Sequence, residues 1–220
     1  MLLYADNMIL IKNQKKIYRL NGSLTMNEAN ISESKSKVAA GSRHVHDMVY
    51  IALGTVLIAV CSWISIPTQV PFTLQTMGVF LVCGLLGGRR GTLAVLVYIL
   101  LGAIGVPVFS GFTGGIGRLL GPTGGYIVGF LASALIYWLF EKLLGKKLWV
   151  KILSMVLGLL ACYAFGTIWF YIVYNQNTGT MGWATVLSIC VIPFIPFDAL
   201  KIALALLLSQ SLGHLLRNKL

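Results

Sequence analysis

The chain has 220 residues, of which 57% are hydrophobic and 10% are charged, and its formal net charge is +11. Soluble domains carry about 25% charged residues, so this composition excludes a water-soluble enzyme, a nucleic-acid-binding domain and a disordered chain. The mean hydropathy of +0.85 predicts an all-α polytopic membrane protein.

The N-terminal 47 residues differ from the rest of the chain, because they contain many Lys and Arg residues and no sustained apolar run. Residues 21–46 are mostly Ser, Asn, Glu, Lys and Gly, a composition typical of solvated or disordered segments. We therefore expect a polar, basic and disordered arm over residues 1–47, followed by a membrane domain over residues 48–220.

Long apolar stretches separated by short charged clusters follow this arm. A helix needs about 20 residues, at a rise of about 1.5 Å each, to cross the hydrocarbon core of a bilayer. The pattern predicts six transmembrane helices over residues 48–66, 71–88, 91–107, 123–144, 149–174 and 185–214.

Basic residues are distributed unevenly among the predicted connections. Arg89 and Arg90 follow the second helix and a Lys cluster at 142–151 follows the fourth, whereas the other connections are rich in Pro, Gly, Asn and Thr. If both termini are cytoplasmic, all of the 17 Lys and Arg residues except Arg118 and Lys201 lie at the cytoplasmic side, as the positive-inside rule requires. We predict an N-in, C-in topology, with the positive charge facing anionic lipid and not nucleic acid.

The sequence offers no recognisable motif for a metal, a cofactor or a nucleotide. The four cysteines lie inside or at the edges of the apolar stretches, at spacings that fit neither a zinc site nor a disulfide framework. His44 and His46 have no Cys or carboxylate at ligand spacing. The G-x-x-x-x-G-K-[ST] motif is missing from the sequence. We expect no metal and no cofactor on this chain, and any ATP to be bound by partner subunits.

A glycine-rich segment, residues 109–126, connects the third and fourth predicted helices at the outer face. It holds seven glycines and a proline but also Ile, Leu and Phe. Irregular backbone at membrane depth is tolerated where it lines a cavity, and glycine lets backbone approach a ligand closely. We favour a cavity-lining loop. The alternative is helix packing, because glycines recur every four residues from Gly117 to Gly129, although Pro122 argues against one continuous helix.

Two charged residues, Asp198 and Lys201, fall within the last apolar stretch. Pro196 suits the first turn of a helix, which places the two on one face near the outer end of that helix. A charge at membrane depth costs about 2.5–3.5 kcal/mol on insertion scales and usually faces the protein interior. We expect the pair to contact a ligand. The alternative is that Asp198 complements the helix N-terminus and Lys201 pairs with it or extends to the membrane surface.

The outer side of the predicted bundle suits a small amphipathic monoanion. Arg118, Lys201 and Asp198 together give a net charge of +1, and a ligand pocket is mostly apolar with a few polar groups. An enzyme would need a nucleophile with its base, a carboxylate pair or a metal cluster, and the predicted helices contain none of these. The aromatic residues expected to form the cavity wall are Trp63, Phe72, Phe109, Phe112, Tyr126 and Phe197.

Three motifs occur in a specific order over residues 48–216. The first is IPTQVPFTLQT at 66–76 with GLLGGRRG at 84–91, the second is LGAIGVPVF at 101–109 running into GPTGGY at 121–126, and the third is the Asp-x-x-Lys of Asp198 and Lys201. Together they resemble the BioY family, the biotin-specific substrate-binding S components of energy-coupling-factor (ECF) transporters.

The resemblance implies a six-helix S component in the plasma membrane of a prokaryote. It would bind biotin from outside, beneath the loop between helices three and four, and assemble with a transmembrane coupling subunit and two cytoplasmic ATPases. The implied ligand residues are Thr113, Gly114, Gly115, Tyr126, Asp198 and Lys201.

This chain departs from the family pattern in the glycine-rich segment. Some members carry Asn at the position of Thr113 and Arg directly after the Tyr, where this chain has Ile127. Since Arg118 lies on the same loop, we expect it to supply the missing positive charge to the ligand. The alternative functions are an S component for another vitamin and a structural membrane subunit.

Overall fold

The computed structural model describes residues 44–68, 70–177 and 179–217. Two compact units make up the chain, Met1–Met48 and Val49–Leu220, and the fold given below is that of the second. The arm predicted over residues 1–47 lies outside the described residues except for 44–47. Those four residues are helical and belong to the helix His44–Trp63, so the first predicted helix begins earlier than expected.

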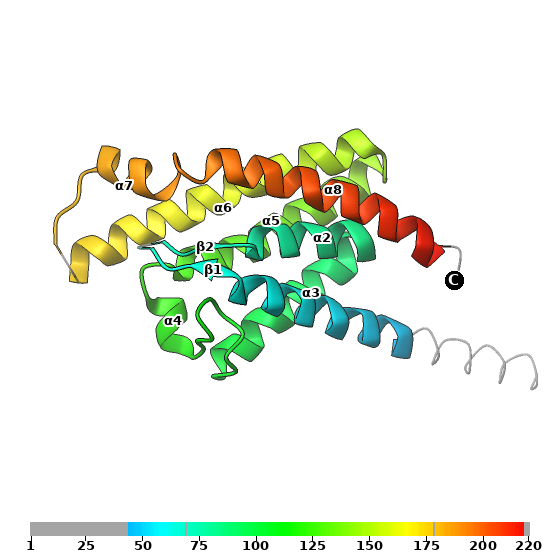
Figure 1. Cartoon of the computed structure of the whole chain (residues 1–220), viewed down its shortest axis with the longest axis horizontal. Helices are drawn as coiled ribbons and strands as arrows, with labels where there is room; N and C mark the ends of the chain where they lie inside the picture. Colours follow the sequence, from blue (N-terminus) through cyan, green and yellow to red (C-terminus); the bar gives the residue numbers. More distant parts are fainter. Residues whose placement is uncertain (1–43, 69, 178, 218–220) are drawn as a thin grey trace, which may run out of the picture. The chain divides into compact units, whose positions relative to one another are not determined.

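The described chain is almost entirely helical, as predicted (Figure 1). After the helix His44–Trp63, a small hairpin pairs strands β1 (Ser65–Ile66) and β2 (Phe72–Thr73) antiparallel. The later helices are α2 (Gln75–Leu86), α3 (Gly88–Ala103), α4 (Ile116–Leu120), α5 (Gly124–Leu144), α6 (Leu148–Asn177), α7 (Trp183–Cys190) and α8 (Ile195–Arg217).

Four stretches of the described chain are long and apolar enough to cross a membrane: His44–Trp63, Gly124–Leu144, Leu148–Asn177 and Trp183–Gly213. The second and third predicted helices are present but short, with 12 residues in α2 and 16 in α3. The first residues of the second predicted helix form strand β2 of the hairpin instead. Helix α2 ends before Gly87, which has a φ of +83°. Gly105, with φ of +104°, lies just beyond the end of α3.

The last predicted helix, 185–214, is divided into α7 and α8 by a turn at residues 191–194. Pro193 lies in this turn, and Pro196 falls in the first turn of α8. A proline lacks the backbone N–H that a helix interior needs, but at the first turn that donor would have no partner. The two prolines therefore fix where α8 begins, and with it the position of Asp198.

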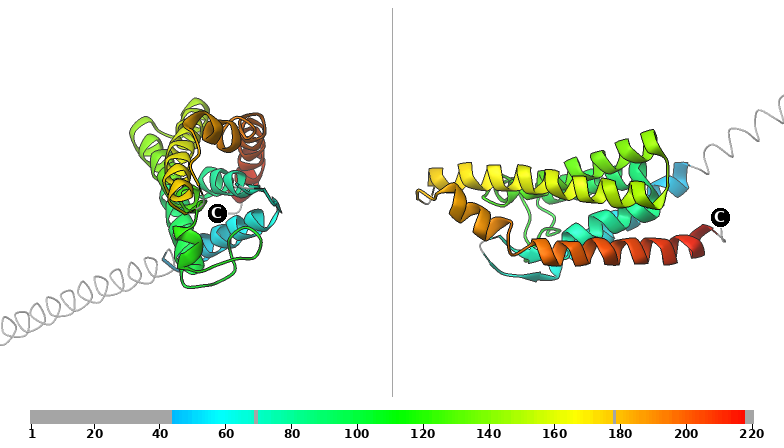
Figure 2. Two further views of the ribbon diagram at one scale, coloured as in Figure 1. Left: turned by 90° about the vertical axis from the view of Figure 1, so that its left-hand side faces the viewer. Right: turned by 90° about the horizontal axis from the view of Figure 1, so that it is seen from above.

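Helices α5 and α6 lie side by side along their length (Figures 1 and 2). A side chain at Gly129 would contact the backbone of Cys162, and one at Gly158 would contact Ser133. The Ser133 hydroxyl donates a hydrogen bond of 2.6 Å to the Gly158 carbonyl. Small residues let helices approach closely, and a hydroxyl between them supplies a hydrogen bond that lipid cannot.

The glycines of the segment 109–126 and Gly129 fall into two groups, because some lie in a loop and others pack against a helix. Gly125 and Gly129 pack against α6, as the packing alternative requires. A side chain at Gly117 would contact nothing in the described chain, and one at Gly121 would contact only carbonyl oxygens of α4. Gly121 is joined to α6 by its carbonyl oxygen, which accepts a hydrogen bond of 3.0 Å from Trp169 Nε1, and the backbone is irregular between α4 and α5. The segment is therefore a loop with one short helix, and it packs as a continuous helix only from Gly124 onward.

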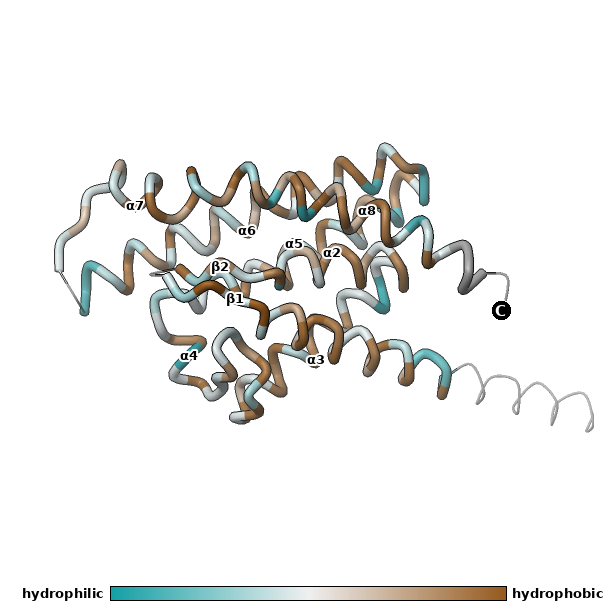
Figure 3. Tube along the Cα trace, viewed as in Figure 1, coloured by the Kyte–Doolittle hydropathy of each residue, from teal (hydrophilic) through white to brown (hydrophobic). Residues whose placement is uncertain are grey.

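The basic connections lie together at one end of the helices. The Gly88 amide donates to Glu141 Oε2, which joins the α2–α3 connection to the end of α5, and Lys151 Nζ lies 3.4 Å from the Gly84 carbonyl oxygen. The hairpin, α4 and α7 lie at the opposite end (Figure 2). Apolar residues predominate along the helices between the two ends (Figure 3).

Candidate functional site

A cavity is lined by residues of the hairpin, of α2, α4, α5, α6, α7 and α8, and of the loop between α3 and α4. The empty space between its side chains is about 680 Å³, open solvent at its mouth included. Four of the predicted ligand residues line it: Arg118, Tyr126, Asp198 and Lys201.

The two charged residues of α8 face this cavity as an ion pair. Lys201 Nζ donates a hydrogen bond of 2.8 Å to Asp198 Oδ1, and the two residues are only 4% and 2% exposed. A buried ion pair loses hydration that its mutual attraction only partly restores, so it is weak evidence for stability. Its position in a cavity wall favours the ligand role over the helix-terminus alternative.

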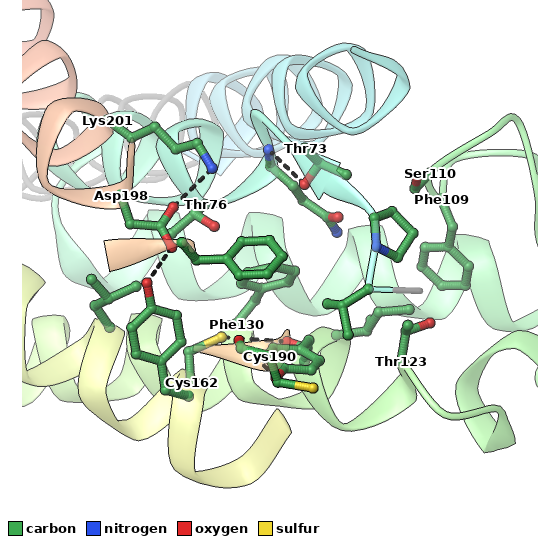
Figure 4. A pocket seen from close by; sticks show the side chains of 18 of the residues that line it. Thr73, Thr76, Phe109, Ser110, Thr123, Phe130, Cys162, Cys190, Asp198 and Lys201 are labelled. Carbon is green, nitrogen blue, oxygen red and sulfur yellow. Dashed lines mark hydrogen bonds and ion pairs between the residues drawn. The ribbon is translucent and has the colours of Figure 1, made fainter. Parts of the chain in front are cut away.

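Tyr163 of α6 completes the surroundings of the carboxylate. Its hydroxyl donates a hydrogen bond of 2.5 Å to Asp198 Oδ2, so both carboxylate oxygens are held by donors (Figure 4). Tyr163 was not among the predicted site residues, because the type of a residue in an apolar helix does not indicate a partner 35 residues away.

Phe72, from strand β2, covers the ammonium group of Lys201. The Lys201 nitrogen lies 4.2 Å from the centre of the Phe72 ring, which also packs against Phe194 and Phe197. A cation over an aromatic face is stabilised by the ring quadrupole, more so where water is excluded. The hairpin thus fixes one side of the ion pair.

Tyr126 and Arg118 reach the cavity from the glycine-rich segment. The Tyr126 hydroxyl lies 3.2 Å from Thr167 Oγ1 and 3.4 Å from the Cys190 carbonyl oxygen, which ties α5 to α6 and α7. Arg118 is half-buried, and its guanidinium group has no hydrogen bond or ion pair with any residue in the described part of the chain. Ile127 lines the same cavity as Arg118.

Thr113, Gly114 and Gly115 do not line the cavity, although they were predicted to contact a ligand. The Thr113 hydroxyl donates to the Ser110 carbonyl oxygen, and Gly115, with φ of +97°, donates its N–H to the Gly102 carbonyl oxygen. A side chain at Gly114 would overlap the Val106 carbonyl. The loop therefore folds back onto the end of α3, and it is Phe109 and Ser110 that it presents to the cavity.

The predicted aromatic wall is only partly present. Phe109 and Tyr126 line the cavity. Trp63 and Phe112 instead stack on each other, with ring centres 4.9 Å apart, and Phe197 is largely exposed. Other apolar residues of the wall are Val70, Pro71, Ile127, Phe130, Leu159 and Phe194.

Polar groups are distributed along the cavity, with Thr73 between two groups at its sides (Figure 4). Asp198, Lys201 and Thr76 lie together at one side, and Ser110 and Thr123 lie at the other (Figure 4). Arg118 belongs to α4, the short helix that leads into Thr123. In the described part of the chain, no group of three His, Cys, Asp or Glu residues could hold a metal ion.

Comparison with known proteins identifies the family. Residues 29–218 match the sequence model of the BioY family. The chain is 40% identical to a biotin transporter BioY of Thermotoga maritima over 172 residues, which are 78% of this chain and 98% of that one. It is 38% identical to the biotin transporter BioY2 of Lactococcus lactis over 176 residues, 77% of this chain and 93% of the relative.

A solved structure shares the fold. The crystal structure of the S-component for biotin from an ECF-type ABC transporter superposes with a TM-score of 0.69 at 29% identity, over 78% of this chain and 92% of that one. The chain therefore belongs to the BioY family, a family of transporter proteins and not of enzymes.

Proposed function

We propose that this chain is the biotin-binding S component of an ECF transporter, a membrane subunit that takes up biotin together with an ATP-driven energising module. The family assignment and the likeness to a biotin S-component support this function. The observation that carries it is the cavity itself, in which a buried Asp198–Lys201 pair faces a mostly apolar space that also contains Arg118.

The chemistry of biotin matches this arrangement of groups. Biotin has a ureido ring with two N–H donors and one carbonyl acceptor, an apolar bicyclic body and a carboxylate on a flexible chain. Asp198 is an acceptor for a ureido N–H, and Lys201 is a donor for the ureido oxygen. Arg118, toward the other side of the cavity, is the counter-charge for the carboxylate, and charge-assisted hydrogen bonds are the strong ones.

The predicted ligand residues have two different roles in this proposal. Arg118, Tyr126, Asp198 and Lys201 contact biotin, because each of them lines the cavity. Thr113, Gly114 and Gly115 act by shaping the loop that brings Phe109 and Ser110 to the wall.

The proposal includes six membrane crossings with both termini in the cytoplasm of a prokaryotic cell and the protein in the plasma membrane. The common location of Arg89, Arg90 and the 142–151 cluster supports this orientation. The partners are a transmembrane coupling subunit and two cytoplasmic ATPases. ATP is bound by those ATPases, and this chain needs no cofactor of its own.

Equilibrium binding of labelled biotin to the purified protein in nanodiscs tests the proposal. We expect saturable binding that unlabelled biotin displaces and that riboflavin and thiamine do not. Displacement by another vitamin in preference to biotin would assign the chain to a different substrate. Failure to bind any of the three would favour a structural membrane subunit.

A further inference from the structure

Gln75, the first residue of α2, is a polar residue of the cavity wall that the proposed function does not use. It is 5% exposed and lines the cavity beside Thr73 and Thr76. An amide has two N–H donors and an acceptor oxygen, and a buried polar group is unfavourable unless its bonds are made. The hydrogen bonds of Gln75 therefore show which of its atoms remain available to a ligand.

The nitrogen side of the amide is held by Tyr98. Gln75 Nε2 donates a hydrogen bond of 2.7 Å to Tyr98 Oη, and Tyr98 Oη donates one of 3.1 Å to the Val108 carbonyl oxygen. A phenol has a single proton, and a carbonyl oxygen can only accept. Because that proton is directed to Val108, the phenol oxygen accepts from Gln75, and the group facing Tyr98 must be the amide NH₂.

The oxygen side of the amide is left open. Gln75 Oε1 accepts no hydrogen bond from any residue within the described ranges. The backbone N–H of Gln75 is held 3.2 Å from Thr73 Oγ1, so the residue is fixed at both its main chain and its amide nitrogen. An oriented acceptor without a hydrogen-bond partner in the described chain is thus part of the cavity wall.

Tyr98 itself is fixed from several directions. It is fully buried, and the Phe109 ring packs edge-on against it with ring centres 5.5 Å apart. The Val108 carbonyl that it contacts also accepts a hydrogen bond of 2.5 Å from Ser62 Oγ. The glycine-rich segment and the helix His44–Trp63 therefore hold the group that orients Gln75.

We infer that Gln75 is a specificity-determining residue whose amide oxygen accepts a hydrogen bond from a ligand N–H, and that Tyr98 is its positioning residue. This inference rests on the proposed function, because the ureido ring of biotin has two N–H donors. Asp198 accepts one of them and Gln75 accepts the other. A site with oriented acceptors rejects an analogue that lacks the matching donor, because the acceptor is then left unpaired.

Two substitutions at Gln75 test the acceptor, Gln75→Leu and Gln75→Met, which keep an apolar side chain of similar size. We expect each to weaken biotin binding by about tenfold, as the loss of one hydrogen bond to a buried acceptor does. Biotin methylated on one or the other ureido nitrogen serves as a further probe. Methylation of the nitrogen that faces Gln75 should make the affinities of wild type and Gln75→Leu equal. Tyr137→Phe is the matched control, since it removes a buried hydroxyl that has no hydrogen-bond partner in the described chain.

A double-mutant cycle tests the positioning role of Tyr98. Tyr98→Phe should weaken biotin binding in the wild-type background and have no further effect in the Gln75→Leu background, because it acts through the amide. Equal losses in both backgrounds would overturn the positioning role and leave a packing role. Wild-type affinity in both Gln75 variants, each shown to be monodisperse, would overturn the acceptor role. If the wild-type chain itself does not bind biotin, the proposed function fails. If the wild type binds biotin and the Gln75 variants bind it equally well, only this inference fails.

Discussion

Tyr163 and Asp198 are 35 residues apart in the chain, yet the Tyr163 hydroxyl donates a hydrogen bond of 2.5 Å to Asp198 Oδ2. Asp198 Oδ1 accepts from Lys201 Nζ at 2.8 Å. The carboxylate is therefore oriented by one donor from α6 and one from α8 before any ligand arrives. Each carboxylate oxygen can accept a second hydrogen bond, so a ligand N–H can bind without displacing either donor.

Removing the Tyr163 hydroxyl should loosen this acceptor. We expect Tyr163→Phe to weaken biotin binding by about tenfold, because a hydrogen bond to a charged group contributes about 1.5–3 kcal/mol and each 1.4 kcal/mol is a factor of ten. Isothermal titration of biotin into the purified variant measures the change. Tyr163→Phe should also have no further effect in an Asp198→Asn background, and a loss of equal size there would contradict a role through the carboxylate.

The ion pair itself should be required for binding. Asp198→Asn and Lys201→Met should each reduce biotin affinity by tenfold or more, because each removes a ligand contact and leaves its former partner buried without a counter-charge. Equilibrium binding measures both, after membrane insertion has been checked for each variant. Unchanged affinity in both would reduce the pair to a structural element of the α8 N-terminus.

Much of this site could be predicted from the sequence, because a charge inside an apolar stretch is conspicuous. Asp198 and Lys201 were identified on that ground, and the two prolines indicated where α8 begins. Arg118 was identified because it is an isolated positive charge at the side opposite to the basic clusters.

Other parts of the site depend on contacts that residue types do not reveal. Tyr163 and Gln75 acquire their roles from partners on other helices, and tyrosine or glutamine in an apolar segment has many structural uses. Thr113, Gly114 and Gly115 were predicted to contact the ligand but do not line the cavity, because a glycine-rich loop can fold toward or away from a cavity. Its direction is set by the hydrogen bond from Gly115 to Gly102 and by the positive φ of Gly115, neither of which the composition indicates.

The orientation in the membrane is tested by labelling single cysteines with an impermeant thiol reagent, in a background without the four native cysteines. We expect Thr180→Cys to react from outside intact cells and Lys146→Cys to react only after permeabilisation. The reason is that basic residues resist translocation, and the α5–α6 connection carries several of them. External labelling at position 146 would falsify the N-in, C-in arrangement.

Arg118 is the expected substitute for the positive charge that this chain does not carry at Ile127, and its loss should affect charged ligands selectively. If it is the counter-charge for the biotin carboxylate, Arg118→Ala should weaken biotin binding while binding of an uncharged biotin amide changes little. Arg89→Ala is the control, since Arg89 is an exposed arginine in the basic connection at the opposite end of the helices. Competition between labelled biotin and the amide in nanodiscs measures both affinities.

Two other results for Arg118→Ala would have distinct meanings. If Arg118 closes the loop over the ligand without contacting the carboxylate, biotin and the amide should lose affinity together, with faster dissociation of both. If Arg118 only lies at the membrane surface, its charge contributes about 0–1 kcal/mol to any interaction, and biotin affinity should not change. That last result would leave Lys201 as the cation for the carboxylate, although it already pairs with Asp198 on the other side of the cavity. The carboxylate would then have to lie at the same side of the cavity as Asp198, whose negative charge would repel it.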